Sequence, residues 1–162
     1  MENPNNYEHA APVLGDWLWI GDRHAAEDAD FIARAGITDV LTVALEVTPA
    51  IDPARNIRIG LHDEHPGKER NSDEALLRVA EAIDRVCEPG GIRLLVHCAE
   101  GRNRSVASVI AYLIRGTVLG GFSRYRYTVL RAYHEISEKY PKARVTAGLL
   151  HHIDTLFFPD HG

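Results

Sequence analysis

One stretch of the chain, residues 92–115, constrains the fold more than any other. IRLLVHC at residues 92–98 is the most strand-like run, and the apolar helical pattern RSVASVIAYLIR follows at residues 104–115. A loop of five residues with one glycine, AEGRN, joins the two. A strand that passes through a short loop into a helix is half of a βαβ unit, in which the helix packs back onto the sheet. We therefore expect a largely parallel sheet.

The remainder of the chain repeats this alternation. β-branched and apolar runs predict strands, and apolar residues at helical spacing predict helices. Asn71 followed by Glu74 resembles a capping box at the start of one of these helices. The sequence thus predicts an α/β fold with a central, mostly parallel sheet and helices on both faces. The predicted strands are residues 18–21, 37–45, 57–61 and 92–98, and the predicted helices are residues 24–36, 71–87, 104–115, 124–140 and 146–158.

The length and composition are those of one ordinary globular domain. The chain has 162 residues, of which 45% are hydrophobic, and this is enough to bury a substantial core. The first residues, MENPNNYEHAAP, are polar and show no periodicity. We expect a flexible leader at residues 1–12, a folded domain at residues 13–158 and a tail at residues 159–162.

Charge and cysteine content exclude several classes of protein. The net charge of −5 argues against a sequence-independent nucleic-acid binder, because such proteins neutralise phosphates with a basic surface. No apolar run approaches the ~20 residues that span a bilayer. Two cysteines are too few for a disulfide scaffold. We therefore predict no nucleic-acid partner, no membrane span and a cytoplasmic location, and the oligomeric state stays open.

The loop after the strand at residues 92–98 has the features of an anion site. Cys98 stands at the carboxyl end of that strand, where ligands of α/β folds bind. The loop N–H groups and the start of the next helix would face the same point. Gly101 allows the backbone to approach an oxyanion closely. The predicted phosphate-binding residues are Ala99, Glu100, Gly101, Arg102, Asn103 and Arg104.

Cys98 is the candidate nucleophile of this loop. A thiol at a helix N-terminus beside cations ionises easily, so we expect a thiolate that attacks phosphorus and forms a phospho-cysteine. Arg104 would bind two phosphoryl oxygens through its planar guanidinium group, and the Ser105 hydroxyl would assist departure of the sulfur. A lone cysteine after an apolar strand is usually a buried small hydrophobe. His, Cys, Gly, Arg and Ser at this spacing, however, suit one chemistry.

The motif HCAEGRNRS matches the HCxxGxxR(S/T) signature of the cysteine-dependent protein tyrosine phosphatase superfamily. The wider chain resembles the dual-specificity phosphatase family, since VLGDWLWIGDRHAA and GITDVLTVA are similar to its N-terminal segments. The resemblance covers residues 13–157 and implies a catalytic domain at residues 13–158. It further implies phosphorylated proteins or peptides as substrates, phosphate, sulfate or vanadate as ligands of the loop, and no metal or other cofactor.

The resemblance also implies an aspartate general acid upstream of the cysteine. Asp63 follows a predicted strand in IRIGLHDEHPGKE, 35 residues before Cys98, and receives that role by comparison. Glu64 is the alternative acid, and both carboxylates could instead be simple surface charges of the loop. Asp73 is better explained as a charge in the first turn of a helix.

Two positions depart from the family pattern. Arg102 adds a second cation to the loop, which either favours more anionic substrates or points to solvent. Val145 and Thr146 stand where relatives often have Pro-Asn before the last helix, so the role of that asparagine is open here. Cys87 lies on an apolar helix face and is predicted to be a core residue. The strand between Cys87 and Cys98 is too long for a disulfide.

Three functions are consistent with these residues. The leading hypothesis is a phosphatase for phosphotyrosine, and for phosphoserine and phosphothreonine, that acts through a phospho-cysteine. The second keeps the chemistry but takes a phosphoinositide, a nucleotide or an RNA 5′-phosphate, with Arg102 as its support. The third is a phosphate-binding pseudophosphatase, which usually lacks the cysteine or the arginine that are present here. A Cys–His hydrolase is disfavoured because His97 points to the opposite side of the strand from Cys98.

Overall fold

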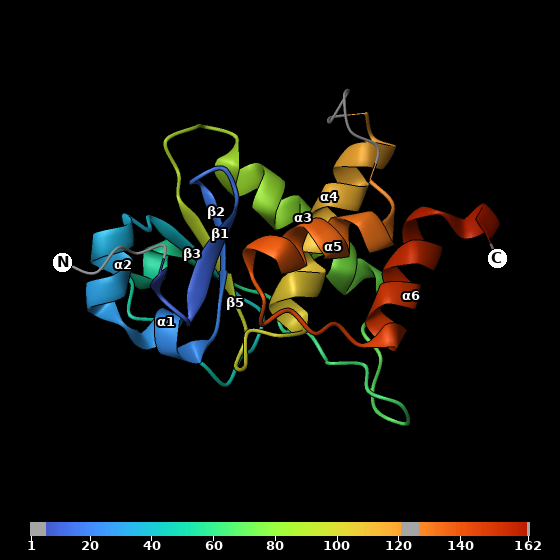
Figure 1. The fold of residues 1–162 in the computed structure, drawn as a ribbon, viewed down its shortest axis with the longest axis horizontal. Helices are drawn as coiled ribbons and strands as arrows, with labels where there is room; N and C mark the ends of the chain where they lie inside the picture. The colour runs from blue at the N-terminus through green and yellow to red at the C-terminus, as the bar shows by residue number, and fades with distance from the viewer. Residues whose placement is uncertain (1–5, 121–126, 162) are drawn as a thin grey trace.

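The computed structural model describes residues 6–120 and 127–161, which fold around one central sheet (Figure 1). Within these residues the sheet has five strands in the order β1-β2-β5-β3-β4. Strand β1 is antiparallel to β2, and the other neighbours are parallel. The predicted mostly parallel sheet is therefore confirmed. The strands are β1 (Ala10–Leu14), β2 (Leu18–Gly21), β3 (Asp39–Thr42), β4 (Asn56–Arg58) and β5 (Leu94–His97).

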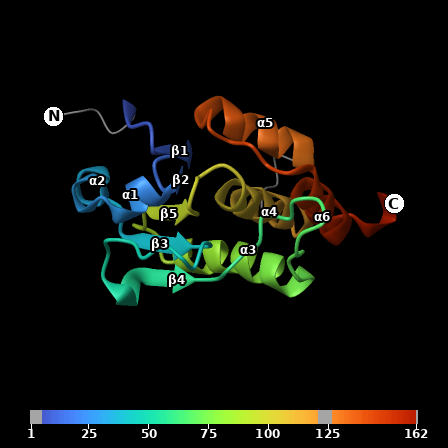
Figure 2. The ribbon, with the colours of Figure 1, turned by 90° about the horizontal axis from the view of Figure 1, so that it is seen from below.

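Helices cover both faces of this sheet, as the sequence predicts. The helices α1 and α2 lie on one side and α3 to α6 on the other (Figure 1, Figure 2). Each face has its own hydrophobic cluster, and Trp19, Phe31 and Leu95 belong to the smaller one, under α1 and α2. The helices are α1 (Arg23–Glu27), α2 (Ala29–Ala35), α3 (Asp73–Cys87), α4 (Arg104–Val118), α5 (Val129–Lys139) and α6 (Ala147–Phe157), with short 3-10 helices at Pro53–Arg55 and Pro159–His161.

Helix α4 is the central helix of the larger layer. It contacts α3, α5, α6 and β5, and its residues from Ser105 to Ala111 are all buried. This burial explains why the sequence of α4 is apolar on nearly every side. The helix continues to Val118, beyond the predicted end at residue 115. Its start is fixed by the core, and this fixes the direction of the loop that precedes it.

The N-terminal part of the chain corrects two predictions. Strand β1 begins at Ala10, so residues 10–12 are not part of a flexible leader. The Tyr7 ring also stacks on Phe31, with centroids 4.5 Å apart, so Tyr7 packs on the domain as well. The helix predicted at residues 24–36 is two helices, because Asp28 ends α1 and its side chain accepts a hydrogen bond from Phe31 N as the cap of α2.

Three further boundaries differ from the prediction. The cap of α3 is Ser72, whose Oγ accepts a hydrogen bond from Ala75 N at 3.1 Å, and not Asn71. The predicted helix at residues 124–140 begins at Val129, and residues 121–126 lie outside the described part of the chain. Part of the predicted tail forms the 3-10 helix at Pro159–His161. Among the described residues, no helix is long and apolar enough to cross a bilayer.

Candidate active site

Cys98 lies directly after β5, at the carboxyl edge of the parallel strands. Its side chain is only 2% exposed. The Sγ atom accepts a hydrogen bond from the backbone N–H of Gly101 at 3.2 Å and lies 3.3 Å from the Ser105 Oγ. Both partners come from the loop and the first turn of α4, so the loop curls around the sulfur. The Gly101 N–H is a fixed donor to the sulfur, and the Ser105 hydroxyl can donate to it as well.

Gly101 is required at the turn of this loop. Its φ angle is +70°, a conformation that side chains disfavour. A Cβ atom here would also lie 2.5 Å from the Tyr140 hydroxyl and 2.9 Å from the Asp22 Cβ. The glycine therefore lets the loop pack against these two buried side chains while its N–H points at Cys98.

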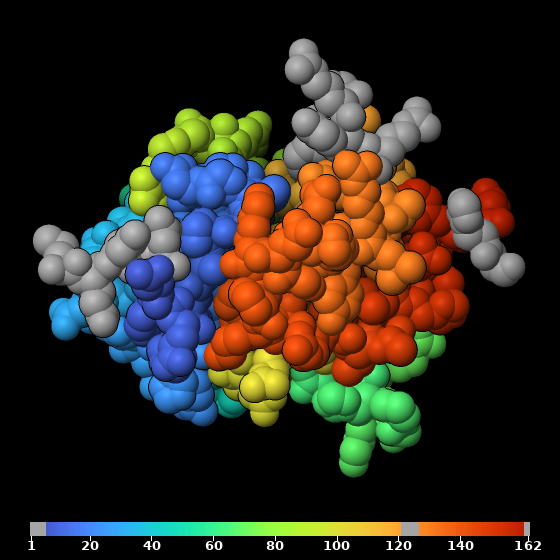
Figure 3. All heavy atoms as spheres, viewed as in Figure 1, coloured from blue at the N-terminus to red at the C-terminus, as the bar shows by residue number. Residues whose placement is uncertain are grey.

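Two backbone hydrogen bonds hold the loop from outside. Arg23 N donates to Ala99 O at 2.9 Å, and Arg144 N donates to Arg102 O at 2.7 Å. The loop, yellow in Figure 3, reaches the surface between the blue N-terminal segment and the orange-red segment that follows α5. The next residue, Asn103, occupies the N-cap position of α4 but makes no side-chain cap. The positive end of α4 therefore faces the loop without a hydrogen bond from the side chain of its own cap residue.

The residues predicted for the site surround one cavity of about 420 Å³. Cys98, Arg104 and Asp63 line it together, and Ser105 contacts the sulfur from below. Gly101 is the one residue of the predicted phosphate-binding set that does not line the cavity, and its N–H donates to the sulfur. The lining residues are Glu46, Asp63, His65, Cys98, Ala99, Glu100, Arg102, Asn103, Arg104 and Arg144.

Arg104 points along the cavity wall and is held by acceptors. Its Nη2 donates to the Glu46 Oε1 at 3.1 Å. Its Nε lies 3.4 Å from the Asp63 Oδ1 as a charge contact that lacks hydrogen-bond geometry. Burial opposes the charge of the guanidinium group, but Glu46, Asp63 and Cys98 outweigh it and raise the pKa of Arg104 above its ordinary value. The side chain is a fixed cation beside the sulfur.

Glu46 is a site residue that the sequence reasoning missed. Its own backbone N–H and the Arg104 guanidinium group hold the pKa of Glu46 below its ordinary value, although partial burial works in the opposite direction. The signal in the sequence is weak: Glu46 follows a predicted strand, at the same edge of the sheet as Cys98. A polar residue after a parallel strand is a candidate for the site, but nothing in the sequence pairs it with Arg104.

Asp63 and Glu64 have opposite environments. Asp63 lines the cavity and has a side chain that is 38% exposed. Glu64 is buried, with a φ angle of +55°, and turns away from the cavity. Its Oε2 accepts hydrogen bonds from the Asn71 side chain at 2.7 Å and from His152 at 2.9 Å. These bonds outweigh burial and lower the pKa of Glu64. Glu64 is therefore a structural carboxylate, whereas Asp63 can reach a ligand.

Asp73 has a partner besides the helix dipole. It lies in the first turn of α3, as predicted, and its Oδ1 is 2.7 Å from the His152 Nε2. The imidazole of His152 thus lies between Glu64 and Asp73, and it joins α6 to the loop and to α3. The sequence did not indicate this contact.

His97 is buried on the opposite side of β5 from the sulfur. Its Nδ1 donates to the Cys98 carbonyl at 3.0 Å, and its Nε2 accepts from the Thr42 hydroxyl at 2.7 Å. Burial lowers the pKa of His97 to about 4. The neutral imidazole therefore orients the backbone at Cys98 and does not act as a base for it, which agrees with the rejection of a Cys–His hydrolase.

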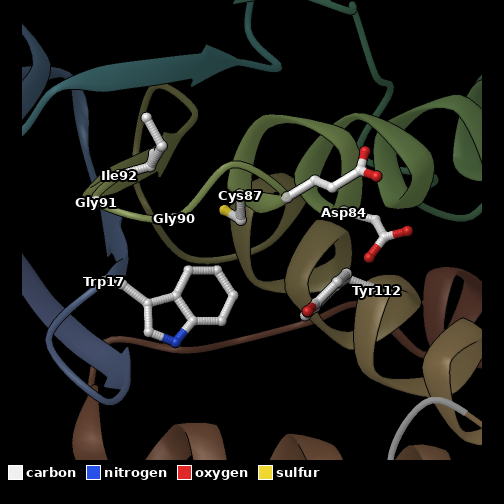
Figure 4. A pocket seen from close by; sticks show the side chains of 8 residues that line it. Trp17, Asp84, Cys87, Gly90, Gly91, Ile92 and Tyr112 are labelled. Carbon is white, nitrogen blue, oxygen red and sulfur yellow. The ribbon is translucent and has the colours of Figure 1, made fainter.

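The other cysteine, Cys87, is half-buried at the opposite end of β5, beside a separate pocket of about 410 Å³ (Figure 4). The side chains of Trp17 and Tyr112 line this pocket with it. Burial, Asp39 and Asp84 raise the pKa of Cys87 to about 11. Cys87 packs against the core without being fully buried, and both cysteines are free thiols. It takes no part in the site.

A mostly parallel sheet whose loops bring a buried cysteine, an arginine and an aspartate to one cavity is the arrangement of a cysteine-dependent phosphatase. The family model for the dual specificity phosphatase catalytic domain matches residues 18–153, so the chain belongs to the dual specificity phosphatase family. It is a hydrolase of the protein phosphatase class.

The chain is also similar to individual known proteins. Dual specificity protein phosphatase 1 of Arabidopsis thaliana is 28% identical over 92% of this chain and 70% of its own length. Dual specificity protein phosphatase 22-A of Danio rerio is 30% identical over 65% of the chain, and the match spans 49% of that protein. The solved structure of human tyrosine phosphatase-like serine/threonine/tyrosine-interacting protein superposes on this chain with a TM-score of 0.76 at 20% identity. The match covers 96% of this chain and 100% of that protein's chain. That last likeness concerns the fold alone.

Proposed function

We propose that the chain hydrolyses phosphotyrosine, and phosphoserine and phosphothreonine, in proteins through a phospho-cysteine intermediate. One observation carries the proposal: the Cys98 sulfur accepts a hydrogen bond from the Gly101 N–H and lies 3.3 Å from the Ser105 hydroxyl, while Arg104 and Asp63 line the same cavity. A nucleophile, a cation and an acid thus face one ligand-sized space. This is the set of groups that phosphoryl transfer through a covalent intermediate requires.

The first step transfers the phosphoryl group to sulfur. The Cys98 thiolate attacks phosphorus, so an S–P bond forms while the bond from phosphorus to the ester oxygen breaks. Asp63 gives its proton to the departing oxygen, which leaves as a neutral alcohol or phenol. Arg104 binds two of the three equatorial oxygens as charge accumulates on them. The other N–H groups of the loop between Ala99 and Asn103 bind the same oxygens, while the Gly101 N–H stays directed at the sulfur.

The second step releases phosphate and restores the enzyme. A water molecule attacks phosphorus, and the Asp63 carboxylate accepts its proton. The S–P bond breaks, and its electron pair returns to Cys98. The Ser105 hydroxyl, 3.3 Å from the sulfur, donates a hydrogen bond that stabilises the departing thiolate. Neither step draws on a metal.

A second substrate class is supported by the mouth of the cavity. Arg102 and Arg144 both line it together with Arg104, so three guanidinium groups face one cavity, which Glu46, Asp63 and Glu100 also line. A phosphoinositide, a nucleotide or an RNA 5′-phosphate would supply further anionic groups. A pseudophosphatase is disfavoured because Cys98 and Arg104 are both present. We infer a cytoplasmic location, in line with a chain that has only two cysteines.

Hydrolysis of an aryl phosphate in the presence of EDTA tests the proposal. We expect turnover that is unaffected by the chelator, blocked by vanadate and absent in Cys98→Ser. Turnover that persists in Cys98→Ser would contradict the phospho-cysteine mechanism. A panel of phosphotyrosine and phosphoserine peptides, with soluble phosphoinositides beside them, then separates the two substrate classes by kcat/KM.

A further inference from the structure

We propose that Asn103 is a positioning residue that holds the carboxyl group of Asp63 for proton transfer. Asn103 lies in the loop, five residues after Cys98, and is 8% exposed. The proposal rests on the general-acid role proposed above for Asp63. It adds how that acid, which comes from a distant loop, is fixed to the loop that carries the nucleophile.

The carboxamide of Asn103 has all of its hydrogen-bonding groups engaged between two segments. Its Nδ2 donates to the Asp63 carbonyl at 2.8 Å and to the Asp63 Oδ1 at 3.0 Å. Its Oδ1 accepts from Thr146 N at 2.9 Å. The Thr146 hydroxyl closes the bridge by donating to the Asp63 carbonyl at 2.9 Å. The segment between β4 and α3 accordingly runs beside the ends of α4 and α6 in both ribbon views (Figure 1, Figure 2).

The orientation of this amide is fixed by its partners. A backbone N–H can only donate, so the Thr146 N–H requires the amide oxygen of Asn103. The two oxygens of Asp63 face the other side and require the amide nitrogen. A flipped amide would lose all three hydrogen bonds. The side chain of Asn103 is also not occupied as a helix cap, because it makes no cap hydrogen bond to α4.

These contacts make the two carboxyl oxygens of Asp63 unequal. Oδ1 accepts the Asn103 N–H and lies 3.4 Å from the Arg104 Nε, so both of its neighbours are donors. A proton on Oδ1 would face two other protons. Oδ2 lies near the His65 Nε2, at the longer distance of 4.0 Å. Asn103 therefore places the acidic proton on Oδ2, which leaves Asp63 ready to donate it to the departing oxygen.

Thr146 has a supporting role on the opposite side of Asn103. It caps α6 by accepting a hydrogen bond from Leu149 N at 3.3 Å, while its hydroxyl donates to the Asp63 carbonyl. The loop with Asp63 is thus bound to α6 through Thr146 and to the loop of Cys98 through Asn103. Thr146 therefore has a defined contact here, although relatives often have Pro-Asn where this chain has Val145 and Thr146. The polar contact at this corner of the site is made by Thr146 from α6 and by Asn103 from the loop.

The test measures kcat and KM for a series of aryl phosphates whose phenols differ in acidity. We compare the native protein with Asn103→Ala, the isosteric Asn103→Asp, and Asp63→Asn. A misplaced acid matters most for poor leaving groups, so both Asn103 variants should lose kcat about tenfold to a hundredfold there. For the best leaving groups their kcat should fall less than threefold, with little change in KM. Asn103→Asp preserves the shape of the side chain if Asn103→Ala fails to fold.

Asn71→Ala is the matched control. Asn71 is also a buried asparagine, and its amide donates a hydrogen bond to Glu64 in the same loop but makes no hydrogen bond to Asp63. It should change kcat equally across the series. Asn103→Ala in an Asp63→Asn background should cost no further rate for poor leaving groups. The role of Asn103 would be overturned if the loss of kcat depended on the leaving group in Asp63→Asn but not in the Asn103 variants. It would also be overturned if Asn71→Ala showed the same dependence as the Asn103 variants. An Asp63→Asn variant without that dependence would instead overturn the general acid itself.

Discussion

The Oγ of Ser105 lies 3.3 Å from the Sγ of Cys98, and both residues are buried at the base of the loop. A hydroxyl in this place can donate to the sulfur when negative charge returns to it. Its effect should therefore be largest in the second step, in which the S–P bond breaks. The first step consumes the charge on sulfur and gains little from the same contact.

Replacing Ser105 by alanine should slow hydrolysis of the intermediate more than its formation. One hydrogen bond to a charged group is worth about 1.5–3 kcal/mol, so kcat should fall about tenfold to a hundredfold. Rapid-mixing kinetics with an aryl phosphate should then show a burst of phenol equal to the enzyme concentration. Ser108→Ala is the matched control, because the Ser108 hydroxyl donates to Arg104 O within α4. A lower kcat without a burst would contradict the role of Ser105.

The Glu46–Arg104 pair should influence anion binding modestly. The Glu46 side chain is 54% exposed, and pairs of this kind contribute about 0.2–1 kcal/mol. Glu46→Gln should therefore weaken vanadate inhibition by about twofold to fivefold, because Arg104 is less well held. Glu100→Gln removes a carboxylate from the same cavity and should instead tighten inhibition. Equal effects of the two variants would show that only net charge matters.

Substitutions of the neighbouring residues Asp63 and Glu64 should have different effects, one on catalysis and the other on stability. Asp63→Asn should lower kcat by about 10²–10⁴-fold for poor leaving groups and less for good ones, because it removes proton donation. Glu64→Gln should leave the leaving-group dependence of kcat unchanged but lower the free energy of unfolding by about 1–3 kcal/mol, since it disturbs the buried bonds to Asn71 and His152. Kinetics and urea unfolding of both variants check this. A change in leaving-group dependence in Glu64→Gln would contradict the assignment.

His97 should make the fold sensitive to mild acid. Burial lowers the pKa of His97 to about 4 in the folded protein, below its ordinary value of about 6.5. The unfolded chain therefore binds the proton first, and the free energy of unfolding falls as the pH drops from about 6.5 towards 4. The full difference corresponds to about 3 kcal/mol.

Urea unfolding at pH 7 and pH 4.5 measures this effect. Other groups also titrate over this range, so the change in the native protein is compared with the change in His97→Gln. The variant should be less stable at pH 7, because it loses the contacts to Thr42 and the Cys98 carbonyl, but it should lose less stability on acidification. Equal losses in the two proteins would show that His97 is not the group responsible.

The sequence predicted those parts of the site that are local in the chain. The loop from Cys98 to Ser105 is one strand-to-helix turn, so the spacing of its residues indicates which of them lie around the sulfur, although Arg23 and Arg144 also hold the loop. Asp63 received the general-acid role only by comparison with a family, with Glu64 as the alternative. The structure separates the two because Glu64 adopts a φ angle of +55° and turns towards His152, 88 residues away. No local pattern contains that contact.

The features that were missed depend on contacts between distant segments. Glu46 meets Arg104 across 58 residues, and Thr146 meets Asp63 across 83. Strand β1 was missed for a different reason. It is a short edge strand that contains Pro12, and its burial does not alternate, so it lacks the pattern by which strands are identified. Its place beside β2 becomes visible only in the folded sheet.

Arg102 should favour the binding of substrates with additional negative charge, without a part in the phosphoryl-transfer step. It lines the cavity beside Arg104, and its backbone is held by Arg144 N, so its guanidinium group can meet a second anion near the bound phosphate. Arg102→Ala should raise KM for a doubly phosphorylated peptide about twofold to fivefold, with kcat for an aryl phosphate nearly unchanged. High salt should remove the difference, because it screens exposed charges.

Arg23→Ala is the control, since Arg23 borders the loop but pairs with Glu27 outside the cavity. An equal rise in KM for singly and doubly phosphorylated peptides would contradict a second anion contact at Arg102.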